Sequence, residues 1–119
     1  MWNAHRAAVY ARQHGVSHSL GRCAHYVTDA IRNGGGISIN NTHYAKDMGN
    51  NLILAGFYKV SGEPKEGDIA VIQAIPGHPY GHACIYDGRQ WISDFIQRTM
   101  YPGQSYRNLH PSYAVYRHN

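Results

Sequence analysis

The stretch SLGRCAHYVTDAIRNGG, residues 19–35, has the apolar spacing of one amphipathic helix, and this helix decides the expected fold. Its apolar side chains recur at i, i+4, i+7 and i+8, and they are Cys23, Val27, Ala30 and Ile31. Ser19 is a suitable N-cap residue, and the glycines at 34–36 end the pattern. The stretch therefore predicts a helix that begins just before Cys23 and buries its apolar stripe.

Two further helices are expected on either side of this stretch. Residues 4–14 carry alanines at helical spacing and are followed by a glycine, where a helix would end. A third helix is predicted over about 43–54, opened by Asn41 or Thr42.

The rest of the chain consists of short β-like runs separated by turns with proline and glycine. The runs are FYKV (57–60), DIAVIQAI (68–75), HACIYDG (82–88), QWISDFI (90–96) and YAVYR (113–117). Helices followed by strands predict an α+β fold in which an antiparallel sheet packs against the helix of Cys23. At 119 residues, the chain 1–119 is expected to form a single domain. The long segment 98–112 is predicted to be a loop that lines a cleft.

The composition is that of a packed globular protein, with 43% hydrophobic and 15% charged residues. The net charge of +4 favours anionic partners, but the basic residues are scattered, which argues against nucleic acid. No apolar run approaches the ~18 residues of a membrane span, and the N-terminal segment lacks the apolar core of a secretory signal. We expect no nucleic-acid partner, no membrane insertion, and a monomer made in the cytoplasm without a signal peptide.

Cys23 is the candidate nucleophile. A thiol in the first turn of a helix lies at the positive end of the helix dipole, next to unpartnered amide hydrogens, and both favour the thiolate. The same amides could hold an oxyanion. His82 begins a predicted strand and follows Gly81, which leaves room for a close approach. A cysteine and a histidine from distant segments are a pattern of nucleophilic catalysis, with the histidine as base.

The third member of such a site depends on the hairpin after His82. A two-residue loop at Asp87 and Gly88 would place Ser93 on the face of His82. A three-residue loop with a bulge at Gly88 would place Asp94 there instead. The alternation of side chains in the next run does not choose between the two registers. A carboxylate that accepts the imidazole N–H fixes the tautomer and stabilises the imidazolium, so the chemistry favours Asp94.

The two cysteines are too few for a disulfide scaffold, and both are expected to be free thiols. Cys84 lies two residues after His82 and is expected to be a small core side chain. His78 and His82 with either cysteine could be drawn as a zinc site. However, the spacing lacks the paired ligands of zinc motifs and leaves the helix-start position of Cys23 unexplained. We expect no metal and no cofactor.

Two segments together resemble the papain-like CHAP domains (cysteine, histidine-dependent amidohydrolases/peptidases) and their NlpC-type relatives. They are GRCAHYVTDAIRNGG (21–35) and PKEGDIAVIQAIPGHPYGHACIYDGRQWISDF (64–95). The resemblance is strongest to the small peptidoglycan amidases of type VI secretion effectors and phages, and it runs from about residue 4 to the end. Its most specific parts are the cysteine at the helix start, GDI-x-V, GH-x3-Y-x-G and W-x-SDF.

The resemblance implies a papain-like fold and assigns a role to three residues. Cys23 would be the nucleophile, His82 the general base and acid, and Asp94 the group that orients His82. The substrate would be an amide bond of peptidoglycan, in the stem peptide or at the muramoyl-peptide junction. The protein would act in the periplasm or cell wall of a target cell, after delivery by a secretion system or during phage lysis. An effector of this kind would need a periplasmic immunity protein as inhibitor.

Two other functions stay open at this point. A non-catalytic module of the same fold could bind the cell wall, but it would not need a thiol, a histidine and a carboxylate together. A papain-like acyltransferase or deamidase would use the same residues on a different acceptor or amide.

Overall fold

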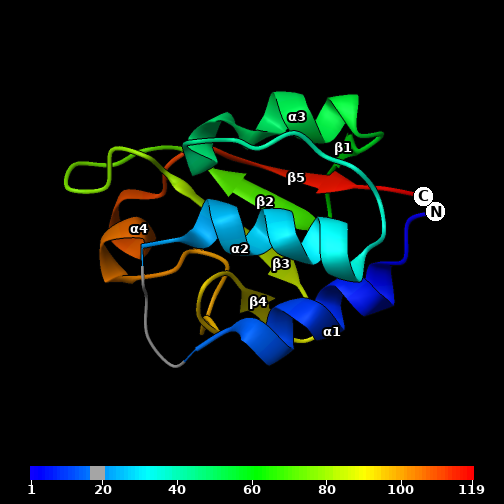
Figure 1. The fold of residues 1–119 in the computed structure, drawn as a ribbon. Coiled ribbons are helices and arrows are strands. Elements are labelled where there is room, and N and C mark those ends of the chain that lie inside the picture. Colours follow the sequence, from blue (N-terminus) through cyan, green and yellow to red (C-terminus); the bar gives the residue numbers. More distant parts are fainter. Residues whose placement is uncertain (17–20) are drawn as a thin grey trace.

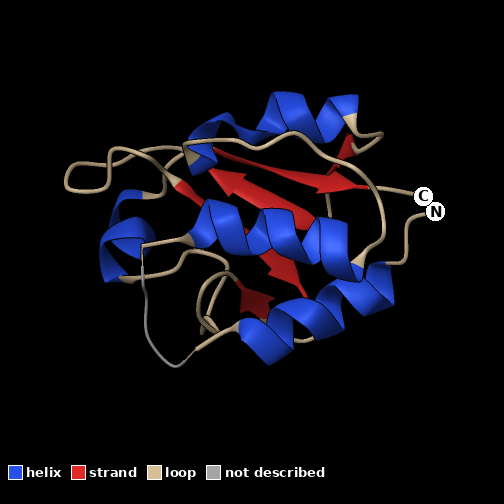
Figure 2. Cartoon of the chain, viewed as in Figure 1, coloured by secondary structure: helices blue, strands red, loops and turns tan. Residues whose placement is uncertain are grey.

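The computed structural model describes residues 1–16 and 21–119, and its centre is an antiparallel sheet with the strand order β1-β5-β2-β3-β4 (Figures 1 and 2). The strands are β1 (Tyr58–Val60), β2 (Ile69–Ile72), β3 (His82–Tyr86), β4 (Trp91–Ile92) and β5 (Tyr113–Arg117). Each of the five predicted β-like runs contains one of them. The predicted α+β class is confirmed at this level.

The helices match the expected ones except for the last. They are α1 (Ala4–His14), α2 (Cys23–Asp29), η1 (Ala30–Gly34), η2 (Ala45–Asp47), α3 (Met48–Leu54) and α4 (Gln104–Leu109). The π-helical segment η1 continues α2, and a single 3-10 turn, η2, leads into α3. Among the described residues, no helix is both long and apolar enough to cross a membrane.

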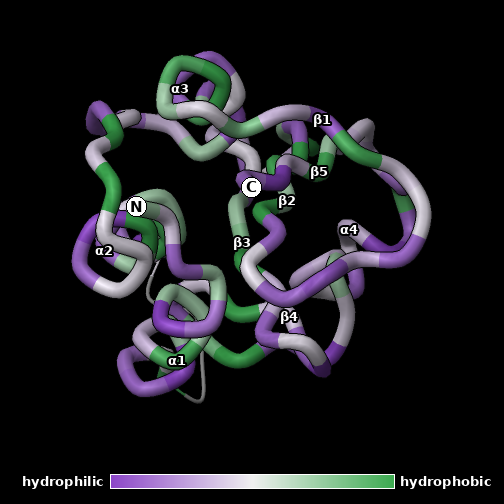
Figure 3. Tube along the Cα trace, turned by 90° about the vertical axis from the view of Figure 1, so that its right-hand side faces the viewer, coloured by the Kyte–Doolittle hydropathy of each residue, from purple (hydrophilic) through white to green (hydrophobic). Residues whose placement is uncertain are grey.

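Helix α2 begins at Cys23, as predicted, and lies across one face of the sheet (Figure 1). The predicted stripe is buried, with Val27, Ala30 and Ile31 at most 1% exposed. It packs with α1 and with the inward side chains of β2 and β3, which are Ile69, Val71, Ala83 and Ile85. Figure 3 shows these apolar strands in the middle of the molecule, with α1, α2 and α3 around them. The predicted cap, Ser19, lies outside the described residues.

Part of the opposite face of the sheet, at β2 and β3, is covered by the segment 97–112, which includes α4. The prediction of a simple loop over 98–112 is therefore wrong in part. The six-residue helix α4 buries only Tyr106, so its sequence carries no apolar repeat that would predict it. Tyr106 packs with Ile72 of β2 and Ile75, and this small cluster fixes α4 beside the start of β3.

The hairpin between β3 and β4 follows neither predicted register. Ile85 pairs with Ile92 and Tyr86 with Trp91, so Asp87 begins a turn that its own backbone bond to Gln90 closes. The Asp87 carboxylate explains this choice, because it accepts hydrogen bonds from the backbone N–H groups of the two residues that end the turn, at 2.8 and 2.6 Å. The turn itself therefore sets the register.

A second reversal follows at once. The N–H of Gln97 donates to the carbonyl of Trp91, so residues 93–95 form a tight turn and 96–97 run back beside β4. Strand parity could not anticipate this, because parity holds only while a strand continues. The reversal returns Gln97 to the neighbourhood of His82.

Candidate cysteine and histidine site

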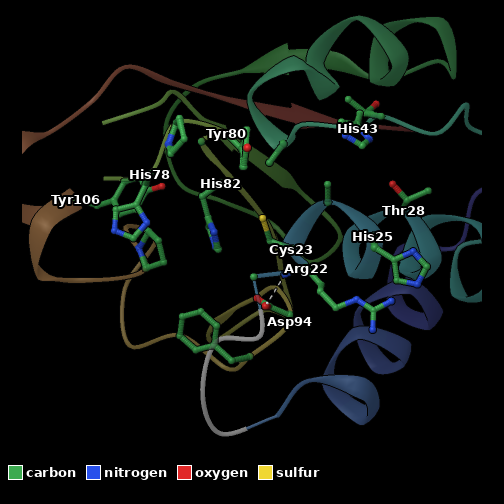
Figure 4. Close-up of a pocket in the computed structure, with 18 of the residues that line it drawn as sticks. Arg22, Cys23, His25, Thr28, His43, His78, Tyr80, His82, Asp94 and Tyr106 are labelled. Carbon is green, nitrogen blue, oxygen red and sulfur yellow. Dashed lines mark hydrogen bonds between the residues drawn. The ribbon is translucent and has the colours of Figure 1, made fainter. Parts of the chain in front are cut away.

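Cys23 and His82 both line a cleft of about 1180 Å³. Its walls come from the start of α2, the segment 41–45, the loop 77–81 with His82 at the start of β3, the turn at 94–95, and residues 102–106. Figure 4 shows Cys23 at the helix start, with His82 on one side of it and His25 and Thr28 on the other. The prediction that part of 98–112 lines a cleft is confirmed.

Three backbone N–H groups favour the thiolate of Cys23, those of Ala83, Ala24 and Cys23 itself. These amides lower the pKa of the thiol, but burial is the largest influence and raises it, and the negative charge of Asp94 raises it further. The net pKa lies above the usual 9.0. The amides at the helix start therefore favour the thiolate, as expected, but desolvation outweighs their effect on the pKa.

His82 reaches the cleft because Gly81 passes very close to neighbouring backbone. Gly81 has φ of 70°, and a Cβ at this position would lie 2.3 Å from the carbonyl oxygen of Ile72. Only glycine allows this approach without displacement, as the sequence predicted. The close passage brings His82 in at the first position of β3, one residue before Ala83, whose N–H lowers the pKa of the Cys23 thiol.

The imidazole of His82 is held by Gln97. Its Nε2 lies 2.7 Å from Gln97 Oε1. The amide nitrogen of Gln97 donates to the carbonyls of Thr99 and Met100, at 3.0 and 2.9 Å, which fixes the oxygen as the atom that faces the ring. An acceptor at Nε2 requires a proton there, so in the neutral ring the lone pair is on Nδ1.

Burial keeps the His82 ring neutral. Desolvation lowers its pKa below the usual 6.5, and the charge of a protonated His78 would lower it further. The bond to Gln97 and the negative charge of Asp94 act in the opposite direction but do not cancel the burial. Near neutral pH the site therefore contains a neutral thiol and a neutral imidazole, and within residues 1–16 and 21–119 the Nδ1 of the ring makes no hydrogen bond.

Asp94 has a different place from the one expected. It is fully buried, and its carboxylate accepts hydrogen bonds from the backbone N–H of Arg22, at 3.0 Å, and from the Ser93 hydroxyl, at 3.1 Å. The hydrogen bond to the His82 ring that we expected from Asp94 is made by Gln97 instead. Asp94 thus binds the start of α2 and acts on both Cys23 and His82 through its charge.

Gln97 is the site residue that sequence reasoning missed. It lies 1% exposed within the segment after β4, where only the second chain reversal makes it a neighbour of His82. One signal was available: a glutamine is rarely buried unless all its hydrogen bonds are made, and this one follows an apolar run directly.

Cys84 is fully buried under the site, and burial raises its pKa strongly, so the expectation of a small core thiol is confirmed. Both cysteines are free. Across residues 1–16 and 21–119, no group of three metal-binding side chains comes together.

The fold and the cleft define a class of protein: an α+β chain with a helix-borne cysteine beside a strand-borne histidine. No family model and no curated protein matches the sequence. Solved structures do match. A chain of the native type VI effector–immunity complex Tae3–Tai3 from Ralstonia pickettii is 49% identical, with a TM-score of 0.96 and coverage of 99% of this chain and 100% of that one. The selenomethionine form of the complex gives 51% identity, a TM-score of 0.90 and coverage of 93% and 98%.

At this identity and coverage, the chain belongs to the Tae3 family of type VI effectors. A more distant likeness is to Ly7917, which is 22% identical with a TM-score of 0.59, over 95% of this chain and 62% of that one. This second likeness concerns the fold alone.

Proposed function

We propose that this protein is a cysteine-dependent amidohydrolase that cleaves an amide bond in the peptide part of peptidoglycan. Membership of a type VI effector family supports the toxic role and the cell-wall target. The observation that carries the chemistry is the neutral His82 ring, which Gln97 holds through Nε2, next to a half-buried thiol at a helix start. The order of a cysteine on a helix and a histidine on a following strand fits a papain-like enzyme of the CHAP or NlpC type.

The first half of the reaction forms a thioester. Nδ1 of His82 accepts the proton of the Cys23 thiol as the sulfur attacks the amide carbonyl carbon. The carbonyl oxygen becomes an oxyanion, which the N–H groups of Cys23 and Ala24 can stabilise at the start of α2. The N–H of Arg22 is already bound to Asp94 and takes no part. The imidazolium then gives its proton to the leaving amine, and the carbon–nitrogen bond breaks.

The second half of the reaction returns the enzyme to its starting state. Water enters the position of the departed amine, and Nδ1 of His82 accepts one of its protons as the oxygen attacks the thioester. The same amides stabilise the second oxyanion. The carbon–sulfur bond then breaks, the thiol is protonated again, and the product leaves as a carboxylic acid. No cofactor is required for any of these steps.

Gln97 and Asp94 support this chemistry in different ways. Gln97 positions the ring and selects the tautomer, which is the role that the resemblance assigned to Asp94. Asp94 anchors the start of α2, and its negative charge makes it easier for the buried ring to become an imidazolium.

Family membership also supports a mode of delivery and control. The similar chains come from effector–immunity complexes, which supports a cognate immunity protein as a partner of this chain as well. We propose that the protein is delivered by a type VI system and acts on the cell wall of the target cell.

Digestion of purified sacculi tests the proposal. Mass analysis of the released muropeptides identifies the bond, because cleavage at the muramoyl junction frees whole peptides and cleavage in the stem frees shorter ones. Cys23→Ala and His82→Ala should each abolish release. A protein that binds sacculi but releases nothing, under conditions where a known amidase is active, would instead support a wall-binding module.

A further inference from the structure

Tyr106 presents a buried ring and an unused hydroxyl to the cleft. The residue is 4% exposed and packs with Ile72 and Ile75, and it lines the cleft on the α4 side. Within the described part of the chain, its hydroxyl has no hydrogen-bond partner. The Tyr106 hydroxyl is also accessible to solvent. Among the residues described, the only fully buried side-chain oxygen or nitrogen without a hydrogen-bond partner is Oγ1 of Thr28. The Tyr106 hydroxyl therefore keeps contact with solvent, in a residue that lines the cleft.

The ring lies close to the reacting groups. Its centroid is 6.2 Å from that of His82 and 5.3 Å from that of His78. The phenol is also near enough to Cys23 for the charge of a thiolate to raise the pKa of the phenol. Figure 4 shows Tyr106 and His78 together on one wall, with His82 between them and Cys23. A substrate bound across Cys23 would pass this wall.

The surroundings keep the hydroxyl as a donor. Burial, followed by the effect of Cys23, raises the pKa of Tyr106 to about 12, so the O–H stays protonated at any physiological pH. A phenylalanine at this position would pack in the same way, so the hydroxyl is not needed for packing. An unpaired hydroxyl is costly once water is excluded, unless the arriving molecule supplies an acceptor.

We propose that the Tyr106 hydroxyl donates a hydrogen bond to a carbonyl oxygen of the substrate peptide, next to the amide that is cleaved. Tyr106 would then be a substrate-binding residue on the wall opposite α2. This inference rests on the proposed function for the identity of the substrate, a peptide with amide carbonyls. It adds a residue that neither the resemblance nor the proposed mechanism requires.

Tyr106→Phe removes the hydroxyl and leaves the ring. For hydrolysis of a soluble muropeptide, kcat/KM should fall about ten- to hundredfold, the usual effect of a lost hydrogen bond to substrate. The melting temperature and the rate of Cys23 alkylation by iodoacetamide should not change, because neither depends on a substrate carbonyl. Tyr101→Phe is the matched control. The Tyr101 hydroxyl donates to the Pro111 carbonyl at 2.7 Å, so this variant should lose stability and keep its kcat/KM.

Binding separates this inference from the function on which it rests. In a Cys23→Ala background, Tyr106→Phe should weaken muropeptide binding about tenfold. Unchanged binding and unchanged kcat/KM would overturn the role of Tyr106 while leaving the hydrolase intact. A parallel loss of hydrolysis and alkylation would also overturn it, because Tyr106 would then act by supporting His82. If the wild type binds the muropeptide through Tyr106 but releases no product, the proposed function fails and the contact stands.

Discussion

Gln97 contacts His82 by one hydrogen bond and the backbone by two, so a single side chain sets both the position and the tautomer of the ring. We expect Gln97→Leu to lower kcat/KM about ten- to hundredfold, because it leaves a buried imidazole N–H without an acceptor at a cost of ~1–3 kcal/mol. Gln90→Leu is the control, since Gln90 bonds to Arg12 at the surface. Steady-state kinetics on a soluble muropeptide give the comparison. Equal kcat/KM for both variants would mean that another group orients the ring.

Gln97→Glu changes the charge at the same position, and its effect should appear in the pH dependence. A carboxylate beside Nε2 stabilises the imidazolium, so the pKa of His82 rises and the acid limb of kcat/KM moves to higher pH. In the wild type that limb should lie below pH 6.5, because burial lowers the pKa of His82. The pH profiles of the two proteins measure the shift. If the acid limb lies at the same pH in both proteins, Gln97 is not in direct contact with the His82 ring.

The half-buried thiol of Cys23 should behave as a neutral group. Burial and Asp94 raise its pKa, so its alkylation by iodoacetamide should reach half of the maximum rate only above pH 9.0. Asp94→Asn removes one of the raising influences, and its alkylation profile should move to lower pH. Mass spectrometry of the Cys23 peptide follows the reaction. The fully buried Cys84 is the internal control, which should stay unmodified while the protein is folded. Half-maximal alkylation below pH 9.0 would indicate a thiolate that already exists in the free enzyme.

Asp94 connects the turn at 93–95 to the start of α2. Asp94→Ala removes the acceptor for the Arg22 N–H and should cost about 1–2 kcal/mol of stability, as the loss of a helix cap does. Asp94→Asn keeps an oxygen for this N–H and should retain most of the stability. Denaturant unfolding of the two variants tests the difference. If both unfold like the wild type, the contact does not hold the helix start.

The loop before β3 depends on Gly81. Gly81→Ala combines a left-handed φ with a clash against the Ile72 carbonyl, whereas Gly77→Ala has a similar φ of 85° and open space around it. Gly81→Ala should therefore lose about 1–3 kcal/mol more stability than Gly77→Ala, the usual cost of overpacking. It should also lose activity, because His82 directly follows it. Thermal unfolding and sacculus digestion measure the two effects, and equal stability of both variants would contradict the close approach.

For the molecule as a whole, periodicity predicted the parts that are long and repetitive. The stripe residues Val27, Ala30 and Ile31 are buried as expected, and the strands β2, β3 and β4 are buried with them, since one face of each must enter the core. The close approach at Gly81 was also predictable, because a residue without a Cβ directly before the strand of His82 leaves room for neighbouring backbone.

The parts that the sequence did not predict arise from short-range geometry. Helix α4 is too short to show a period. The hairpin register depends on side-chain bonds of Asp87, and the partner of His82 depends on a second turn that follows it. The pKa of Cys23 depends on how much water is excluded, which no local pattern encodes.

The proposed role as a wall hydrolase predicts toxicity that depends on compartment. With an added secretion signal, expression in a Gram-negative host should cause lysis, whereas the same protein retained in the cytoplasm should be harmless because it meets no peptidoglycan. The exported Cys23→Ala variant should be harmless as well. Optical density at matched expression is the measurement. Lysis by the exported Cys23→Ala variant would point to damage that does not need the thiol.

In the proposed reaction, Cys23 attacks a peptidoglycan amide and water completes the hydrolysis. The most direct test is digestion of sacculi in water enriched in the oxygen-18 isotope, with mass analysis of the fragments. The wild type and Cys84→Ala should release fragments with one heavy oxygen in a new carboxyl group, and Cys23→Ala should release none. Labelled fragments from Cys23→Ala at the wild-type rate would contradict the claim.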